Sequence, residues 1–366
     1  MSLLIHMLDS GKLDHKRILA IDQTRKTSND RTWCFWEQDS GMFESIVCKS
    51  WDKLWFHSKN YSRLLRISPY RYKMIRGIDF YNYCMQRVLA AKNVSVVFGS
   101  ITEIFSEGDN ARVKVDEQVF QAAFVFSSIQ PEQRSQSGCH YLLQHFMGWI
   151  VEMESDVFDP EHATLMDFQV SQKPGSTFVY QMPFSPRKAL IEYTLFSKSL
   201  LESWEYEFAL REYMNRRFGS VGYQIVEKEW GVIPMTNYQF PRQNKNIFFI
   251  GTAGGRTKPS SGYTFHFIQC QSAAIVTDLL MKGRPIDHQP KKKFNFYDSV
   301  LLNVLSEGKL QGEEIFTDLF KKNSVQNVFA FLDNESSLKQ DFKIISSLPW
   351  KPFLRAGMQE IQAGFV

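Results

Sequence analysis

The pattern of apolar and polar positions predicts a chain that combines strands and helices. Runs that are apolar throughout, or at every second position, predict strands over residues 17–21, 94–98, 101–105, 111–115, 118–120, 124–129, 144–153, 164–170, 177–182, 189–194 and 223–232. Helical spacing predicts helices over residues 1–13, 79–91, 200–218 and 268–281, and a helical region over 294–353. We interpret residues 28–36 as a loop with an aromatic anchor.

This order of elements is typical of a Rossmann-like α/β domain that is interrupted by a second, antiparallel sheet. We assign residues 1–45, 73–135 and 240–290 to a discontinuous nucleotide-binding domain. Residues 46–72 and 136–239 form the inserted sheet, which we expect to bind the substrate. Residues 291–366 form a helical C-terminal region.

The stretch from Asn246 to Phe267 combines an apolar strand, a glycine turn and the start of a helix, which we place at Ser260. Such a stretch directs backbone N–H groups and the positive end of a helix dipole towards an anion or a polarised ring. An ordinary glycine-rich connection is the alternative, and the turn alone favours it. Asp22 ends the strand over 17–21, where a carboxylate can accept hydrogen bonds from a ribose, although a simple turn acid fits equally well.

Composition and charge exclude several classes of function. The net charge of +4 is small and no basic stripe occurs, so we expect no nucleic-acid partner. The five cysteines show no C-x-x-C spacing and the histidines no H-x-x-x-H spacing, which favours reduced thiols in the cytoplasm and no metal site. No apolar run reaches the ~18 residues that span a bilayer. Phenylalanine is frequent, with 31 residues against 20 glycines, which allows a large apolar cavity as well as a core.

Seven motifs, in order, cover nearly the whole chain to about Gly283. They are NDRTWCFWE (29–37), YKMIRGIDFYNY (72–83), QHFMGWIVE (144–152), ATLMDF (163–168), FVYQMPFSPRKALIEYTLFS (178–197), GVIPMTN (231–237) and IGTAGGRTKPSSGYTF (250–265). Together they resemble the lycopene cyclase family of flavoproteins, particularly its bacterial beta-cyclase branch. The first and last motifs are the most specific of the set.

The resemblance implies an enzyme, an isomerase of the intramolecular lyase type, that closes the linear ends of lycopene into beta-ionone rings. The reaction is redox-neutral, yet the family requires reduced FAD, with NADPH or NADH as the source of electrons. Its carotenoid substrate comes from the membrane, so we expect peripheral contact with the inner face of the cell membrane. No protein partner is implied.

Ring closure begins when an acid adds a proton to a terminal double bond, and it ends when a base removes a ring proton. Glu192 in LIEYT matches the glutamate that the family's F-L-E-E-T motif uses for acid–base work, whereas the second acid of that motif is Tyr193 here. Either one carboxyl serves both steps, or reduced flavin supplies the proton. A carboxyl facing an apolar cavity keeps its proton near neutral pH. Asp167 is a second catalytic candidate that tunes Glu192, or a structural acid, which we favour.

The resemblance also implies contacts with FAD. Arg31 would contact the flavin or the pyrophosphate, and the turn would approach the ribityl chain and the pyrophosphate. Gly262 and Tyr263 would lie at the flavin, with backbone amides directed at the ring. The expected cofactor residues are Asp22, Arg31, Gly251, Thr252, Ala253, Gly254, Gly262 and Tyr263.

The family begins with a strand and a G-x-G-x-x-G loop, and Met1 to Leu4 align just after that loop. We therefore expect an N-terminally truncated chain that lacks its first strand and binds FAD poorly. A misplaced start codon is one explanation, which we favour, and a truncated inactive product is the other. The alternatives in function are a related flavoprotein hydroxylase or polyprenyl reductase, and an inactive remnant without FAD.

Overall fold

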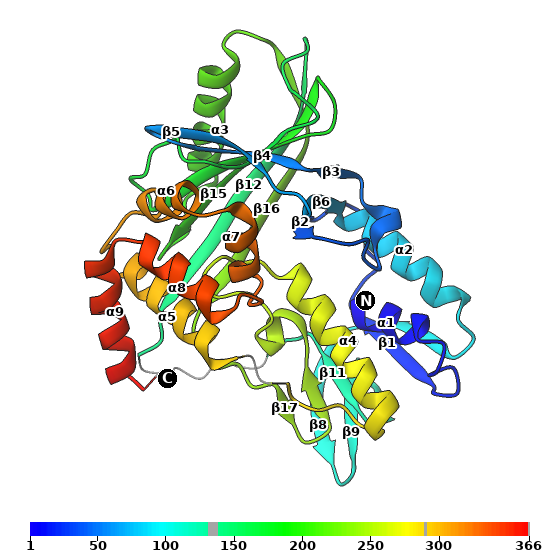
Figure 1. Cartoon of the computed structure of the whole chain (residues 1–366). Coiled ribbons are helices and arrows are strands. Elements are labelled where there is room, and N and C mark those ends of the chain that lie inside the picture. The colour runs from blue at the N-terminus through cyan, green and yellow to red at the C-terminus, as the bar shows by residue number, and fades with distance from the viewer. Residues whose placement is uncertain (131–137, 289–290, 365–366) are drawn as a thin grey trace.

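The largest feature of the molecule is a seven-stranded sheet in the order β16-β12-β15-β14-β13-β4-β5, seen in a computed structural model that describes residues 1–130, 138–288 and 291–364 (Figure 1). All neighbouring pairs run antiparallel except β13 and β4, which run parallel. The strands are β4 (Lys53–Ser58), β5 (Tyr61–Arg66), β12 (Tyr141–Met153), β13 (Ala163–Asp167), β14 (Ser176–Pro183), β15 (Lys188–Ser197) and β16 (Tyr223–Thr236).

This sheet has two buried faces, because successive side chains of a strand point in opposite directions. On β15, Leu190 and Phe196 belong to the largest apolar cluster of the protein. Ile191 and Tyr193 belong to a second cluster, which includes residues of α3 (Ser203–Phe218). We call the side of Leu190 the inner face and the side of Ile191 the α3 face.

The C-terminal region covers the inner face with helices, as the sequence predicts. Within residues 291–364 they are α5 (Lys292–Ser306), α6 (Gly312–Lys322), α7 (Val325–Leu332), α8 (Leu338–Ser347) and α9 (Trp350–Gln362). Phe316 and Phe320 of α6 and Phe329 of α7 are buried in the same cluster as Leu190. Figure 1 shows these helices, in orange and red, beside the long strands.

Small parallel sheets form the part that we predicted to bind a nucleotide. β1 (Ile18–Asp22) pairs with β7 (Val94–Phe98), and β18 (Ile247–Phe249) pairs with β11 (Val125–Ser127). Within the described residues, these two pairs belong to separate sheets. The helices of this part, α1 (Ser2–Asp9), α2 (Gly77–Ala90) and α4 (Phe265–Lys282), lie at the same end of the molecule, where α1 contacts both α2 and α4 (Figure 1).

Two further three-stranded sheets complete the fold. β10 (Gln118–Ala122), β9 (Asn110–Val115) and β8 (Ile101–Glu107) form an antiparallel meander, and β6 (Arg71–Arg76) lies between β2 (Thr32–Glu37) and β3 (Lys49–Trp51). The short elements are β17 (Gln243–Asn244), which pairs with β18, and the 3₁₀ turns η1 (Glu44–Ile46) and η2 (Gly251–Gly254).

The predicted α/β class, with an inserted and mostly antiparallel sheet and a helical C-terminal region, is confirmed. The predicted loop over 28–36 is wrong, because residues 32–37 pair with β6 as a regular antiparallel strand. The predicted helix over 1–13 is shorter and ends at Asp9. The strand over 164–170 ends at Asp167, because Phe168 N–H and Gln169 N–H bond outside the ladder, to the carbonyl of His57 and the carboxylate of Asp167.

Candidate active site

Glu192 lies in the middle of β15, on the inner face of the large sheet. Its direct neighbours across the ladder are Tyr180 on β14 and Gly148 on β12, and Gly148 in turn lies opposite Glu229 on β16. Directly paired residues project on the same side of a sheet. The row therefore places two carboxyl side chains on the inner face, one on each side of a glycine.

Because Gly148 has no side chain, the side chain of Glu229 can lie over it, towards Glu192. A Cβ atom at this position would lie 2.9 Å from Cγ of Glu229 and 3.0 Å from Cδ1 of Leu190. Any larger residue would push the Glu229 side chain out of its position. Glycine in a strand interior often marks a site where another group approaches closely, and here that group is a carboxyl.

Each carboxyl receives one hydrogen bond from a threonine. Thr194 Oγ1 donates to Glu192 Oε1 at 3.0 Å, and Thr32 Oγ1 donates to Glu229 Oε2 at 2.8 Å. Glu229 Oε1 is buried and has no donor in the described part of the chain. Since buried acceptors are almost always bonded, this oxygen marks a place where a proton or a ligand donor is missing.

The environment favours keeping a proton on this pair of carboxyls. Burial raises the pKa of Glu192 well above its ordinary value, and the neighbouring charge of Glu229 raises it further. Burial also raises the pKa of Glu229, although the hydrogen bond from Thr32 partly opposes that effect. Two close carboxyls in an apolar surrounding cannot both ionise readily. The site therefore offers a neutral carboxylic acid that can give up a proton.

Aromatic rings and a thiol surround Glu192. Tyr180 lies beside it on β14, and burial raises the pKa of this tyrosine and of Tyr72. Tyr263 packs edge-on against Trp36, with 4.4 Å between the ring centroids. Because residues 32, 34 and 36 lie on one face of β2, the NDRTWCFWE motif contributes Thr32, Cys34 and Trp36 to this surrounding.

The space next to Glu192 is not completely filled by protein atoms. Glu192, Cys34 and Tyr263 lie deep in the molecule, where burial is the largest influence on the pKa of each group. Each nevertheless retains some solvent-accessible surface. A water-sized molecule can therefore reach these side chains, which lie among aromatic rings.

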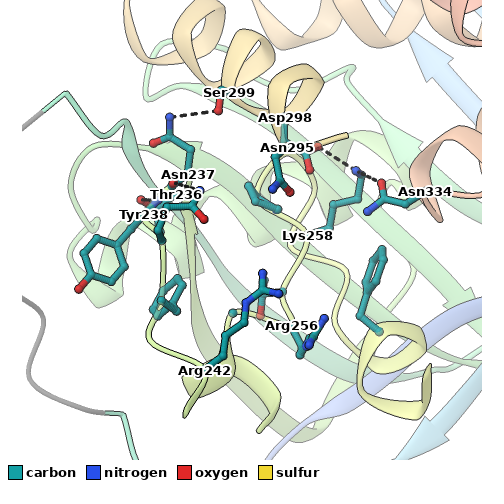
Figure 2. A pocket seen from close by; sticks show the side chains of 16 residues that line it. Thr236, Asn237, Tyr238, Arg242, Arg256, Lys258, Asn295, Asp298, Ser299 and Asn334 are labelled. Atoms are coloured by element: carbon teal, nitrogen blue, oxygen red, sulfur yellow. Dashed lines mark hydrogen bonds and ion pairs between the residues drawn. The ribbon is translucent and has the colours of Figure 1, made fainter. Parts of the chain in front are cut away.

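A separate polar pocket lies beside the glycine-rich stretch, and Figure 2 shows the side chains that line it. Lys258 Nζ contacts Asp298 Oδ1 at 2.8 Å and Asn334 Oδ1 at 2.7 Å, which ties the stretch to the C-terminal helices. Arg242 and Arg256 form the opposite wall. Burial lowers the pKa of Arg256 to about 10, and its Nε atom has no hydrogen-bond partner in the described residues.

The residues that we expect to bind the cofactor differ in their burial and in their hydrogen-bond partners. Gly251 N–H donates to the side chain of Gln271 at 2.9 Å, and Ala253 and Gly254 are buried. Arg31 is exposed and pairs with Asp30 at 3.1 Å. Asp22 lies at the carboxyl end of β1, where Oδ1 accepts a hydrogen bond from Gln23 N–H.

The predicted helix start at Ser260 is wrong, because α4 begins at Phe265. Gly262 has φ +72°, and its N–H donates to the carbonyl of Lys258 at 2.9 Å, so it is not directed at a ring. A Cβ at Gly262 would lie 1.9 Å from Oε1 of Gln144. That oxygen is buried on the inner face without a donor in the described residues.

Asp167 and Glu192 do not meet. Asp167 pairs with Val179 across the ladder, so its side chain projects on the α3 face, opposite to Glu192. Its Oδ2 accepts a hydrogen bond from the Tyr213 hydroxyl at 3.0 Å, and its Oδ1 accepts one from Gln169 N–H at 2.9 Å. This placement favours the structural alternative for Asp167.

Solved structures place this architecture among flavoproteins. The chain resembles a flavoprotein/dehydrogenase from Cytophaga hutchinsonii with a TM-score of 0.60 and 11% identity, over 99% of this chain and 96% of the other. It resembles a geranylgeranyl bacteriochlorophyll reductase-like protein from Thermoplasma acidophilum with a TM-score of 0.56 and 10% identity, over 100% and 96%. At these identities the likeness concerns the fold alone.

Residues 6–358 match the family described as "Lycopene cyclase protein", and the chain therefore belongs to this family. Curated relatives include the chloroplastic neoxanthin synthase of Solanum tuberosum, 28% identical over 155 residues, and that of Solanum lycopersicum, 30% identical over 135 residues. These matches cover 39% and 34% of this chain, and 30% and 26% of the relatives. The chain thus spans less than a third of their length.

Proposed function

We propose that this chain is a lycopene beta-cyclase, an isomerase that converts the linear ends of lycopene to beta-ionone rings. One observation carries the proposal. Glu192 is a carboxyl held protonated on the inner face, among aromatic rings and beside unfilled space. A proton-initiated cyclisation requires such an acid next to an apolar substrate, whereas hydride transfer or oxygen activation does not.

The residues suggest how the reaction proceeds. The Glu192 proton adds to the terminal double bond, which leaves a tertiary carbocation on the neighbouring carbon. An internal alkene attacks this cation and closes the ring, and loss of a ring proton restores neutrality. The faces of Tyr180 and Tyr263 stabilise the cation without trapping it, by about 1 to 2 kcal/mol for each desolvated ring.

We propose FAD in its reduced form as the cofactor, with NADPH or NADH as the reductant. The residues present fit part of such a group. Asp22 stands at the end of a parallel strand, where a ribose binds in dinucleotide folds. When bound, reduced FAD supplies negative charge that stabilises a cation in its neighbourhood, with no net change of redox state.

A second function is a polyprenyl reductase or a flavoprotein hydroxylase. The likeness to a reductase-like protein favours it, although only at the level of fold. An inactive remnant without FAD is the third candidate. The buried acid pair argues against an inert protein, since strongly perturbed carboxyls cluster at functional sites. Reduction of a double bond also consumes a proton, so the reaction product separates the cyclase from the reductase.

Expression in cells that accumulate lycopene separates these candidates. We expect gamma- or beta-carotene, the products of closing one end or both ends. Hydrogenated or oxygenated carotenoids would support the second candidate instead, and unchanged lycopene together with absent flavin absorbance in the purified chain would support the third.

We also propose peripheral contact with the inner, cytoplasmic face of the cell membrane. In the part of the chain that the structure describes, no helix has the length and apolarity to cross a bilayer. The outer sides of α8 and α9 carry exposed apolar side chains, and we call this surface the α8–α9 face. Its apolar residues are Leu338, Phe342, Ile345, Trp350, Leu354, Met358 and Ile361.

The charges of this face fit an anionic bilayer. Every exposed charged residue between 338 and 364 is basic, because both acids of this segment are buried; the four are Lys339, Lys343, Lys351 and Arg355. Apolar side chains flanked by basic ones are typical of helices that lie in a membrane interface.

Sedimentation with vesicles that contain phosphatidylglycerol tests the contact. We expect the chain to sediment with them, less so at high salt, and the Phe342→Ser/Trp350→Ser variant to remain in solution. Leu89→Ser is the matched control, because Leu89 is 66% exposed on α2, far from this face in sequence. Equal sedimentation of both variants and the parent chain would refute the proposed surface.

A further inference from the structure

The second acid of the reaction is missing from the LIEYT motif, where Tyr193 takes its position. Tyr193 points to the α3 face and does not reach the site. The inner face nevertheless holds a second carboxyl, that of Glu229, which arrives from β16 across Gly148. The register of the sheet brings it beside Glu192 although 36 residues separate the two in sequence.

The Glu229 carboxyl is buried but only partly hydrogen-bonded. It is 6% exposed, it accepts one hydrogen bond from Thr32, and its other oxygen has no donor among the described residues. The charge of Glu229 raises the pKa of Glu192, and the two side chains interact with each other. Because Glu229 lies beside a second buried acid, a single proton shared with Glu192 would supply the bond that this oxygen lacks.

We propose that Glu192 and Glu229 form one acid–base pair, in which Glu192 gives the proton to the terminal double bond and Glu229 removes the ring proton. This inference rests on the proposed cyclase function and assigns the base of that reaction. Gly148 is the positioning residue, because only glycine leaves room for the two carboxyls to approach.

The steps balance without an external acid, base or oxidant. The pair begins with one proton, on Glu192, and that proton forms the new C–H bond of the substrate. The ring carbon–carbon bond then forms, and the electrons of a ring C–H bond become the ring double bond as its proton passes to Glu229. Transfer of that proton to Glu192 restores the starting state, and the number of electrons in the substrate is unchanged.

The position of Glu229 would also determine where the double bond forms in the ring. The ring cation can lose a proton from any of three neighbouring carbons, and each loss gives a different position of the double bond. A base fixed on one side of the ring removes only the proton within its reach, as expected for positioned general bases. The identity of the ring isomer therefore reports on Glu229 separately from the rate.

The test compares four chains in cells that accumulate lycopene, and then as purified proteins with reduced FAD. We expect Glu229→Gln to lower beta-ring formation roughly 100-fold, within the range for loss of a general base, and to release rings with the double bond at other positions. Gly148→Ala should also lower the rate of beta-ring formation, because the added methyl group displaces Glu229. Asp167→Asn is the matched control, a buried acid on the other face, and should form beta rings at the parent rate.

The pH profile gives a second readout. Removing the charge of Glu229 lowers the pKa of Glu192, so the basic limb of the activity profile should move to lower pH in Glu229→Gln. Thr32→Val leaves both carboxyl groups in place but removes the hydrogen bond to Glu229, which raises the pKa of Glu229. The acidic limb of the activity profile should therefore move to higher pH.

Three results are decisive. If Glu229→Gln folds, binds flavin and forms only beta rings at the parent rate, the inference is wrong and the cyclase function stands. If the parent chain with flavin forms no rings, the proposed function fails first. If Glu229→Gln does not fold, an unchanged profile in Thr32→Val together with a full rate in Gly148→Ala would overturn the pair.

Discussion

The two faces of the large sheet both bury carboxyl groups, but these carboxyls differ in how far their oxygens are hydrogen-bonded. On the α3 face, both oxygens of Asp167 accept hydrogen bonds, and both ring nitrogens of His145 bond to hydroxyls, those of Tyr206 and Ser197. On the inner face, Glu229 Oε1 and Gln144 Oε1 are buried without donors in the described residues. The α3 face also leaves Trp149 Nε1 and Gln181 Oε1 without partners among the described residues, so the contrast concerns the carboxyls.

The comparison teaches where to search for chemistry in a sheet of this kind. A buried polar group with all its bonds made contributes to a unique core, whereas one left with an open position has a desolvation cost that only a proton, a ligand or a substrate can offset. Asp167 on the α3 face fits the first description, and Glu229 on the inner face fits the second. The predictions below test this division, from the largest expected effect to the smallest.

Glu192→Gln should remove the acid and leave the fold intact. We expect beta-ring formation to fall about 1,000-fold, which corresponds to roughly 4 kcal/mol in the barrier. The shape and the neutral state of the side chain are kept, so the unfolding temperature should change little. Product analysis by chromatography and a thermal melt measure the two effects. A Glu192→Gln chain that cyclises at the parent rate would show that Glu192 is not the catalytic acid.

Asp167→Asn should have the opposite profile. The Tyr213 hydroxyl loses a carboxylate acceptor, so we expect the free energy of unfolding to fall by about 1 to 3 kcal/mol, measured by urea denaturation. The rate of ring formation per folded, flavin-loaded molecule should be unchanged. If this variant loses activity while its stability is retained, the α3 face takes part in catalysis and the division is wrong.

The pH dependence of stability should separate the parent chain from Glu192→Gln. The folded-state pKa of Glu192 is raised, so the folded chain holds its proton more tightly than the unfolded chain. That stabilisation is complete below the unfolded value of about 4.3 and is lost as pH rises through the folded pKa, by up to about 1.4 kcal/mol per pH unit. Glu192→Gln has no such proton, and denaturation curves from pH 4 upward should show a flatter profile. Identical slopes would mean that Glu192 is ionised when folded.

Tyr213→Phe should have the smallest effect. It removes one hydrogen bond to Asp167 but leaves the bond from Gln169 N–H, so we expect a loss of about 1 kcal/mol in unfolding and no effect on ring formation. Chemical denaturation of this variant and of Asp167→Asn shows whether the two losses share one interaction. A double variant that loses the sum of both would indicate independent roles.

Sequence patterns predicted the fold class for physical reasons, and the resemblance of LIEYT to a family motif singled out Glu192, whose catalytic role stays a prediction. Alternation and helical spacing are local properties, and LIEYT carries its acid in a recognisable motif. Glu229 and Gly148 were missed because their importance depends on strand register, which joins β15, β12 and β16 over long separations. The only local signal was a glutamate that alternates with Glu227 just before the GVIPMTN motif, and alternation alone does not show which of the two is buried.

The glycine-rich stretch illustrates the same limit. Its turn was located correctly, but the start of α4 was placed five residues too early, at Ser260 instead of Phe265. Tertiary contacts decide that boundary, since Lys258 and Ser260 both bind Asp298 of α5. They hold the segment in a turn, in which the N–H groups of Ser261 and Gly262 bond to the carbonyl of Lys258. The contacts with Asp298 come from a region of the chain that a local reading of the stretch does not include.

Ring formation in deuterated water tests the central claim most directly. The flavin-loaded chain, with reductant, is given lycopene in D₂O, and the product is examined by mass spectrometry and NMR. An acid on the inner face predicts one solvent deuterium in each new ring, at the carbon next to the former cation, with no net gain of hydrogen or oxygen and no ring formed by Glu192→Gln. A product with two added hydrogens or an added oxygen, or deuterated rings formed at the full rate by Glu192→Gln, would contradict it.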